Sequence, residues 1–201
     1  MPLSMKDSIE KITAYDTAHL FRPRRAHDVA APMFIAGGQG SFLWDHDGKR
    51  YFDFLSQWVF ANIGHQHPRM IRALTDQLGT LANIAPSYGH ATRATTAKLL
   101  AERTPAGMDQ VFFTTSGSEA TEHAIRMARL ATGRHKVLAA YRSYHGSTSN
   151  AVALSGDPRR WPGDTATQGF VRFFGPYRYR SAFGAASEAE ECEAALRHLE
   201  Q

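Results

Sequence analysis

The sequence predicts an α/β protein with a parallel sheet, preceded by an N-terminal helix and a β-hairpin. Three observations lead to this prediction. Residues 111–122, which read VFFTTSGSEATE, combine an apolar run, a turn of small residues and the start of a helix. Residues 136–141 form a second apolar run after that helix. Residues 42–54 place apolar runs on both sides of Asp47-Gly48, a dipeptide that favours a hairpin turn.

The remaining elements follow from periodicity and from proline. Residues 8–20 can form a short amphipathic helix before the hairpin at 42–54. A helix begins at Pro68, because proline is favoured in the first helical turn. A further helix spans about 92–103, and residues 170–174 form a short strand. The helix after Pro68 carries apolar residues at helical spacing, which we expect to face inward: Met70, Ile71, Leu74, Leu78 and Leu81.

Residues 111–141 predict a βαβ unit. The helix between the two apolar runs carries alanine and methionine along one face and ends at Gly133. A crossover of this kind joins parallel strands and brings their carboxyl ends to one edge of the sheet. Ligands of such sheets lie beyond the carboxyl ends of the strands. We therefore expect the turns at 116–118 and 142–148 to face one crevice.

The turn Ser116-Gly117-Ser118 has the composition of an anion site. Backbone N–H groups at a helix start have no helical partner, and the helix dipole adds partial positive charge, so a phosphate fits there. Gly117 lets the backbone approach a ligand closely, and the hydroxyls of Ser116 and Ser118 can donate to phosphate oxygens. The spacing from Ser116 to Glu119 is also that of a capping box, which any capped helix can show. These residues alone leave both interpretations open.

The motifs resemble those of the class III pyridoxal-phosphate-dependent aminotransferases, which are fold type I enzymes. The segments that carry the resemblance are FFTTSGSEA at 112–120, YHGST at 144–148 and NIGHQHP at 62–68. The likeness runs from about residue 34 to the last residue and corresponds to the first half of such an enzyme.

The resemblance implies a three-layer sandwich with a mostly parallel central sheet, here truncated. Residues 1–60 would form an N-terminal arm and a β segment of the small domain, and residues 61–201 the first part of the cofactor-binding large domain. Gln57-Trp58 and residues 175–181 are most similar to taurine–pyruvate and ω-amino acid–pyruvate members. The implied reaction moves an amino group from a primary amine or ω-amino acid to a keto acid such as pyruvate. The complete protein would be a homodimer.

The resemblance also assigns roles at the two turns. In the family the first turn holds the phosphate of pyridoxal 5'-phosphate, and an aromatic residue of the second turn stacks on the pyridine ring. The first role falls on Ser116, Gly117 and Ser118, and the second on Tyr144. His145 could form a hydrogen bond near the ring or could brace the turn.

Two other aromatic residues are candidate substrate-binding residues. Trp58 lies where amine–pyruvate members place a tryptophan at the border of the substrate pocket, although an aromatic residue after a hairpin is also often a core residue. Tyr88 falls where the family often sends an aromatic residue into the active site of the neighbouring subunit.

The catalytic lysine of the family has no counterpart in this chain. Pyridoxal chemistry needs a lysine that forms a Schiff base with the cofactor and a carboxylate that keeps the pyridine nitrogen protonated. No apolar strand ending in Asp-Glu follows Tyr144, and no lysine has a matching context among Lys6, Lys11, Lys49, Lys98 and Lys136. We expect a truncated chain that is inactive by itself. The alternatives are an inactive fragment that binds phosphate or pyridoxal phosphate, and a class III aminomutase or decarboxylase.

Composition narrows the possible partners. The chain has 201 residues and a formal net charge of +4. Because it has a single cysteine, a framework of disulfides within the chain is excluded. Neither a signal peptide nor an apolar run of membrane-spanning length is present, which favours a cytoplasmic location. The basic residues follow no nucleic-acid-binding module, so we expect no nucleic-acid partner. The pair His65 and His67 lacks further ligands at suitable spacing, so we expect no metal.

Overall fold

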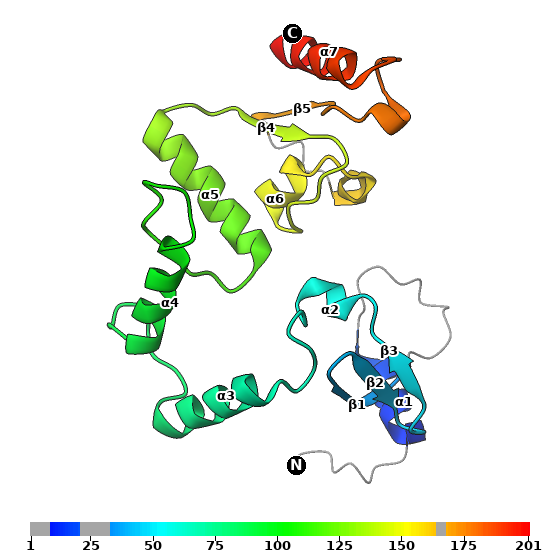
Figure 1. Ribbon diagram of the computed structural model, residues 1–201, viewed down its shortest axis with the longest axis vertical. Coiled ribbons are helices and arrows are strands. Elements are labelled where there is room, and N and C mark those ends of the chain that lie inside the picture. Colours follow the sequence, from blue (N-terminus) through cyan, green and yellow to red (C-terminus); the bar gives the residue numbers. More distant parts are fainter. Residues whose placement is uncertain (1–8, 21–32, 164–167) are drawn as a thin grey trace. The chain divides into compact units, whose positions relative to one another are not determined.

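The computed structural model describes residues 9–20, 33–163 and 168–201 (Figure 1). The chain divides into two compact units, Met1–His90 and Ala91–Gln201. The predicted domain boundary between residues 60 and 61 falls inside the first unit and stays a prediction.

The first unit is built around an antiparallel sheet in the strand order β1-β2-β3. The predicted hairpin is confirmed, because β2 and β3 pair with Phe42 opposite Phe52. The Asp45 carboxylate stabilises the turn between them by accepting the Tyr51 hydroxyl at 2.7 Å and two backbone N–H groups of the turn. The described elements of this unit are α1 (Ile9–His19), β1 (Ile35–Gln39), β2 (Phe42–Asp45), β3 (Arg50–Phe52), α2 (Ser56–Val59) and α3 (Pro68–Thr80).

Strand β1 was not among the predicted elements, because its sequence, IAGGQ, has low strand propensity. Its two glycines are explained by the neighbouring strand. A Cβ atom at Gly37 would lie 2.7 Å from the Trp44 ring, and one at Gly38 would lie 2.8 Å from the Leu43 side chain. The strand therefore pairs where only glycine fits, which a propensity argument does not detect.

The short element α2 is one left-handed turn. Ser56, Gln57, Trp58 and Val59 have φ angles between 47° and 67°, a region that non-glycine residues rarely adopt. The following helix, α3, begins at Pro68 as predicted. Its apolar face was predicted to point inward, and this prediction is wrong for the described chain, because Met70, Ile71, Leu74 and Leu78 are 38–65% exposed. An amphipathic pattern shows that a face needs a partner and leaves open where the partner comes from.

The second unit contains two long helices that begin with a serine cap. Helix α5 starts after Ser116, and its last turn is closed by Gly133 at φ 66°, whose N–H donates to the Arg129 carbonyl. Helix α7 starts after Ser187 in the same way. The described elements are α4 (Ala91–Ala101), α5 (Gly117–Thr132), β4 (Val137–Ala140), α6 (Ser149–Leu154), the 3₁₀ turns η1 (Pro158–Gly163) and η2 (Arg178–Arg180), β5 (Phe170–Phe173) and α7 (Glu188–Glu200).

Strands β4 and β5 lie side by side and are parallel, with Val137 opposite Phe170. The chain between them forms α6 and η1, so the unit contains a β-α-β connection (Figure 1). The core of the unit lies where α5, β4 and α6 meet, at the buried side chains of Ile125, Ala139 and Leu154. The predicted strands at 136–141 and 170–174 are therefore both present.

The predicted strand at 111–115 is not formed. These residues have no assigned secondary structure, and α5 follows them directly. A strand needs hydrogen bonds to a neighbour, and no described strand pairs with this segment. The parallel pair in the described residues is β4 with β5, rather than the expected pair on either side of α5.

Candidate cofactor-binding site

The start of α5 is capped, and its first two N–H groups remain open to a ligand. The Ser116 hydroxyl accepts the Glu119 N–H at 3.2 Å. The Glu119 carboxylate accepts both the N–H and the hydroxyl of Thr115, at 2.8 and 2.6 Å. The hydrogen bond from the Thr115 hydroxyl, followed by that from its N–H, holds the pKa of Glu119 below its ordinary value. A cap is present, as the spacing predicted, with Thr115 rather than Ser116 as the second partner.

The backbone at Gly117 offers the space that an anion requires. Gly117 and Ser118 are the first two helical residues, and their N–H groups have no acceptor in the described part of the chain. A Cβ atom placed on Gly117 would meet no other atom within 4 Å. Open space, two free donors and the positive end of the helix dipole coincide here, so the turn fits a phosphate group.

The turn at 144–147 packs directly on the first turn of α5. The Ser147 N–H donates to the Ser118 hydroxyl oxygen at 3.1 Å, and the Thr121 hydroxyl donates to the His145 carbonyl at 3.0 Å. Gly146 has a φ of 141°, and a Cβ atom there would lie 2.6 Å from the Ser118 hydroxyl oxygen. The structure thus brings together the two turns that the sequence placed at one crevice. Their cofactor-binding role stays a prediction.

Glu122 joins α5 to α6 and was missed in the sequence. One carboxylate oxygen accepts the Thr148 hydroxyl at 2.6 Å and the N–H groups of Asn150 and Ala151 at 2.8 and 3.1 Å. The other accepts the Asn150 side-chain amide at 2.7 Å. Burial raises the pKa of Glu122, but the hydrogen bonds from Thr148 and Asn150 outweigh burial and leave this pKa below its ordinary value. Glu122 thus supplies the N-terminal cap of α6 from another helix.

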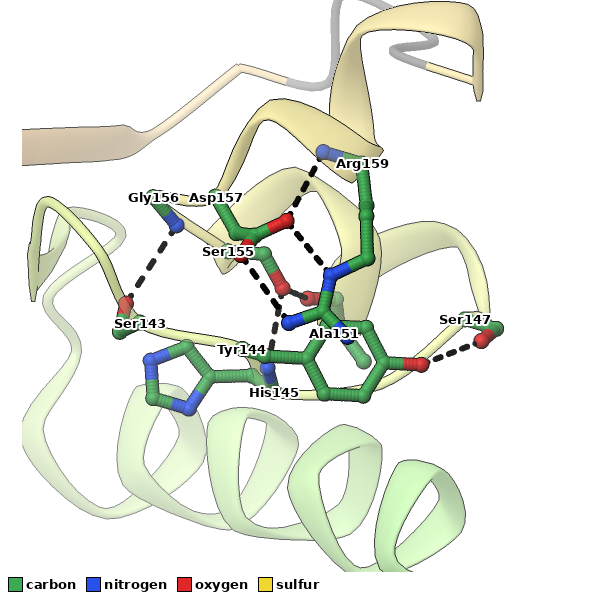
Figure 2. A network of polar contacts seen from close by, with 9 residues as sticks. All are labelled: Ser143, Tyr144, His145, Ser147, Ala151, Ser155, Gly156, Asp157 and Arg159. Carbon is green, nitrogen blue, oxygen red and sulfur yellow. Dashed lines mark hydrogen bonds and ion pairs between the residues drawn. The ribbon is translucent and has the colours of Figure 1, made fainter. Parts of the chain in front are cut away.

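His145 is held through its backbone. Its N–H donates to the Ser155 hydroxyl at 2.9 Å, and that buried hydroxyl donates in turn to the Ala151 carbonyl at 2.9 Å (Figure 2). The main chain of His145 therefore braces the turn, and the role of its side chain stays a prediction. Tyr144 is the exposed aromatic residue of the turn, and its hydroxyl shares a hydrogen bond of 2.7 Å with the Ser147 hydroxyl.

Trp58 and Tyr88 lie in the first unit, and both are 63% exposed. Trp58 is therefore not a core residue of the described chain. It lies on the left-handed turn α2, where the Asp53 carboxylate accepts the backbone N–H of Gln57 at 3.4 Å and its side-chain amide at 3.2 Å. The same carboxylate is hydrogen-bonded to the His65 ring at 2.8 Å. The hydrogen bond to His65 lowers the pKa of Asp53.

A hollow lies at the carboxyl ends of β4 and β5. It has a volume of about 510 Å³ and is lined by Tyr141, Arg142, Phe174, Pro176, Tyr177 and Arg180, among others. The buried Glu191 carboxylate on α7 holds one wall by accepting the Tyr177 N–H at 3.0 Å. Residues 175–181, which carried part of the family resemblance, thus form a wall fixed from α7.

The described ranges hold neither a cluster of metal ligands nor a helix that could span a membrane. Within residues 9–20, 33–163 and 168–201, no three His, Cys, Asp or Glu side chains gather so that they could hold a metal ion. None of the helices in these ranges is both long enough and apolar enough to cross a membrane.

Comparison with protein-family models matches residues 24–201 to aminotransferase class-III. Among curated proteins, the chain is 36% identical over 142 residues to an acetylornithine aminotransferase of Halalkalibacterium halodurans, covering 71% of this chain and 35% of that protein. It is 42% identical over 127 residues to a glutamate-1-semialdehyde 2,1-aminomutase of Bordetella avium, covering 62% of this chain and 29% of that protein. The chain spans about a third of the length of these relatives.

Solved structures show the same fold. A taurine:2-oxoglutarate aminotransferase from Bifidobacterium kashiwanohense, in complex with PLP and glutamate, superposes with a TM-score of 0.88 at 32% identity. An (S)-enantioselective omega-transaminase from Thermomicrobium roseum superposes with a TM-score of 0.89 at 28% identity. These matches cover 95% and 96% of this chain and 44% and 45% of the two structures. The predicted α/β, fold type I class is confirmed.

Proposed function

The chain belongs to the class III aminotransferase family, and we propose that it is part of a pyridoxal-phosphate-dependent transaminase. The proposed reaction transfers an amino group from a primary amine or ω-amino acid to a keto acid such as pyruvate. Taurine and omega-transaminases among the structural neighbours support this substrate class. The proposed complete protein is a cytoplasmic homodimer that acts on small molecules.

The observation that carries the proposal is the contact between the two turns. Ser116, Gly117 and Ser118 would hold the cofactor phosphate, because the first N–H groups of α5 face open space. The hydroxyls of Ser116 and Ser118 each accept one hydrogen bond and keep their own hydrogen for a phosphate oxygen. Tyr144 would stack on the pyridine ring, with His145 beside it. When bound, the cofactor supplies a carbonyl group for the amino group and a ring that stabilises negative charge.

No lysine of the chain is proposed as the cofactor-linking residue. In the second unit, Lys136 directly precedes β4, at the opposite end of the strand from the Tyr144 turn. Lys98 pairs with Glu102 on the surface of α4 at 2.9 Å. Trp58 and Tyr88 are proposed as substrate-binding residues, because both present exposed aromatic surface.

One relative favours a second candidate function. Glutamate-1-semialdehyde 2,1-aminomutase of Bordetella avium is 42% identical over its matched region. An aminomutase moves an amino group within one molecule and needs the same phosphate and ring contacts. Incubation of the complete enzyme with a labelled amino donor distinguishes the two reactions, because only a transaminase passes label to added pyruvate.

The phosphate site is tested by filling the space above Gly117. We expect the chain to bind pyridoxamine 5'-phosphate in equilibrium dialysis, and Gly117→Asp to abolish binding, since a carboxylate would occupy the anion position. Pyridoxamine phosphate is the probe because it carries no aldehyde that could react with surface lysines. Gly79→Asp, on α3, is the matched control, because a Cβ atom there also meets nothing within 4 Å. Equal binding by Gly117→Asp and the unsubstituted chain would contradict the proposal.

A further inference from the structure

We infer that Asp157 and Arg159 are positioning residues that cover one face of the Tyr144 ring and so present its other face to the cofactor. The inference rests on the proposed function, because it concerns how the stacking residue is held. Both residues follow α6, and neither was singled out in the sequence.

The Arg159 guanidinium lies over the Tyr144 ring, with its Cζ 4.2 Å from the ring centroid (Figure 2). This distance is within the range of cation–π contacts, in which a guanidinium stacks on an aromatic face. Arg159 reaches the ring from η1, whereas the proposed phosphate turn belongs to α5. The Arg159 guanidinium and the proposed phosphate turn therefore come from separate elements, η1 and α5.

Asp157 fixes the guanidinium in this place. Its two carboxylate oxygens accept Nε and Nη2 of Arg159 at 2.6 and 3.0 Å, which is the bidentate geometry that restricts rotation of an arginine fork. The Arg159 backbone N–H also donates to the same carboxylate at 2.9 Å. The side chains are 44% and 24% exposed, and an exposed pair of this kind contributes little to stability. A positioning role explains why Arg159 makes three hydrogen bonds to one carboxylate.

The hydroxyl end of the ring is also fixed. The Tyr144 hydroxyl is bonded to Ser147, whose N–H is bonded to Ser118 in the phosphate turn. Tyr144 is still 41% exposed with Arg159 stacked on it, so ring surface remains for a ligand. A ring that is held before binding loses less conformational entropy when it stacks on a cofactor. Removing Arg159 should therefore weaken ring stacking and leave the phosphate contacts intact.

The test compares two probes on the full 201-residue chain. Dissociation constants for pyridoxamine 5'-phosphate and for inorganic phosphate are measured by equilibrium dialysis for Arg159→Gln, Arg159→Lys and Asp157→Asn. The induced circular dichroism of bound pyridoxamine phosphate reports whether its ring is held in one orientation. Arg134→Gln is the matched control, since it removes an exposed guanidinium from the loop after α5.

For Arg159→Gln we expect affinity for pyridoxamine phosphate to fall about threefold to tenfold, in line with the usual strength of a cation–π contact. The induced dichroism should shrink and the affinity for inorganic phosphate should stay unchanged. Asp157→Asn should act in the same direction, and Arg159→Lys should restore part of the loss. The double variant that combines Arg159→Gln with Asp157→Asn should bind pyridoxamine phosphate no more weakly than Arg159→Gln alone, because Asp157 acts through Arg159.

Two results would overturn the inference and leave the proposed function standing. If Arg159→Gln leaves both the affinity for pyridoxamine phosphate and its induced dichroism unchanged, the Tyr144 ring does not need Arg159 on its face in order to bind the cofactor. An equal loss of affinity for both probes would show that Arg159 contributes only charge. If the unsubstituted chain binds neither probe, the proposed function fails and the inference fails with it, which distinguishes that result from the other two.

Discussion

The backbone N–H of Ser147 donates to the hydroxyl oxygen of Ser118 at 3.1 Å, which fastens the turn before α6 to the first turn of α5. The two residues are distant in sequence, and each lies next to a group with a proposed cofactor role. Ser118 lies beside the open N–H of Gly117, and Ser147 holds the hydroxyl of Tyr144. Together with the hydrogen bond from the Thr121 hydroxyl to the His145 carbonyl, this bond links the geometry of the phosphate site to that of the ring site.

Gly146→Ala should separate the two turns. The added Cβ atom would lie 2.6 Å from the Ser118 hydroxyl oxygen and 2.8 Å from the Ala151 Cβ, at a φ of 141° that other residues rarely adopt. We expect a loss of about 2 to 4 kcal/mol in the free energy of unfolding, measured by urea denaturation. Gly163→Ala is the control, because its Cβ atom would meet nothing within 4 Å. Equal stability of the two variants would contradict the described contact.

Glu122→Gln should destabilise the junction of α5 and α6. The amide nitrogen that replaces one oxygen cannot accept the Asn150 side-chain amide, and the remaining oxygen loses its charge. We expect a loss of about 1 to 2 kcal/mol, at the lower end for charged hydrogen bonds because the site is partly exposed. Glu193→Gln, which removes an exposed carboxylate of α7, should change stability by less than about 0.5 kcal/mol. Chemical denaturation of both variants in parallel gives the comparison.

Stability should fall in acid, and Asp53 should contribute to that fall. Its pKa is lowered in the folded chain by the hydrogen bond to His65, so the unfolded state binds its proton more tightly. The contribution is fully present above the unfolded pKa of about 3.9 and is lost as the pH falls through the folded pKa. We expect Asp53→Asn to flatten the acid limb of a curve of unfolding midpoint against pH. An unchanged acid limb in this variant would mean that the hydrogen bonds to the Asp53 carboxylate add nothing to stability.

The 201-residue chain should have no transaminase activity by itself. None of its lysines has the context of the cofactor-linking residue, so the amino group cannot be transferred through an enzyme-bound cofactor. Chain, pyridoxal phosphate, an amine donor and pyruvate should yield no alanine above the rate without protein. Turnover that disappears when one particular lysine is replaced would identify that lysine as the missing residue.

The isolated chain should self-associate. The side chains of Phe54, Leu55, Trp58, Val59 and Phe60 are 62–90% exposed, and contiguous apolar surface of this kind favours association. The apparent molar mass from light scattering should rise with protein concentration, and this rise should be smaller in a Phe54→Ser, Phe60→Ser double variant. Leu130→Ser, at a single exposed site on α5, should change it much less. A chain that stays monomeric as its concentration is raised, and that binds no hydrophobic dye, would contradict this prediction.

Local patterns predicted most of the elements, and contacts between distant residues were harder to predict. The hairpin at Asp47-Gly48, helix α5 and strand β5 follow from turn residues and periodicity. The segment 111–115 has a strand sequence without a pairing partner in the described residues, and β1 has a partner without a strand sequence. Pairing depends on the neighbour, which a single segment does not contain.

The candidate site divides in the same way. The two turns were predicted to meet because carboxyl ends of parallel strands share an edge, and they do meet, although one expected strand is not formed. Glu122 was missed because its hydrogen-bond donors, Thr148 and Asn150, lie more than 25 positions away along the chain. Arg159 was missed because the stretch around it has neither helical nor strand periodicity, and its partner ring precedes it by a whole helix.

The Glu122 carboxylate also has a consequence for local unfolding. It caps α6 from within α5, so α6 cannot open without exposing a charged group that α5 holds in place. The six residues of α6 should therefore exchange their amide hydrogens together with the first turns of α5, as one cooperative unit. A ligand that binds only the closed state of the α5 turn would slow exchange at Ala151 by mass action, although it touches no atom of α6.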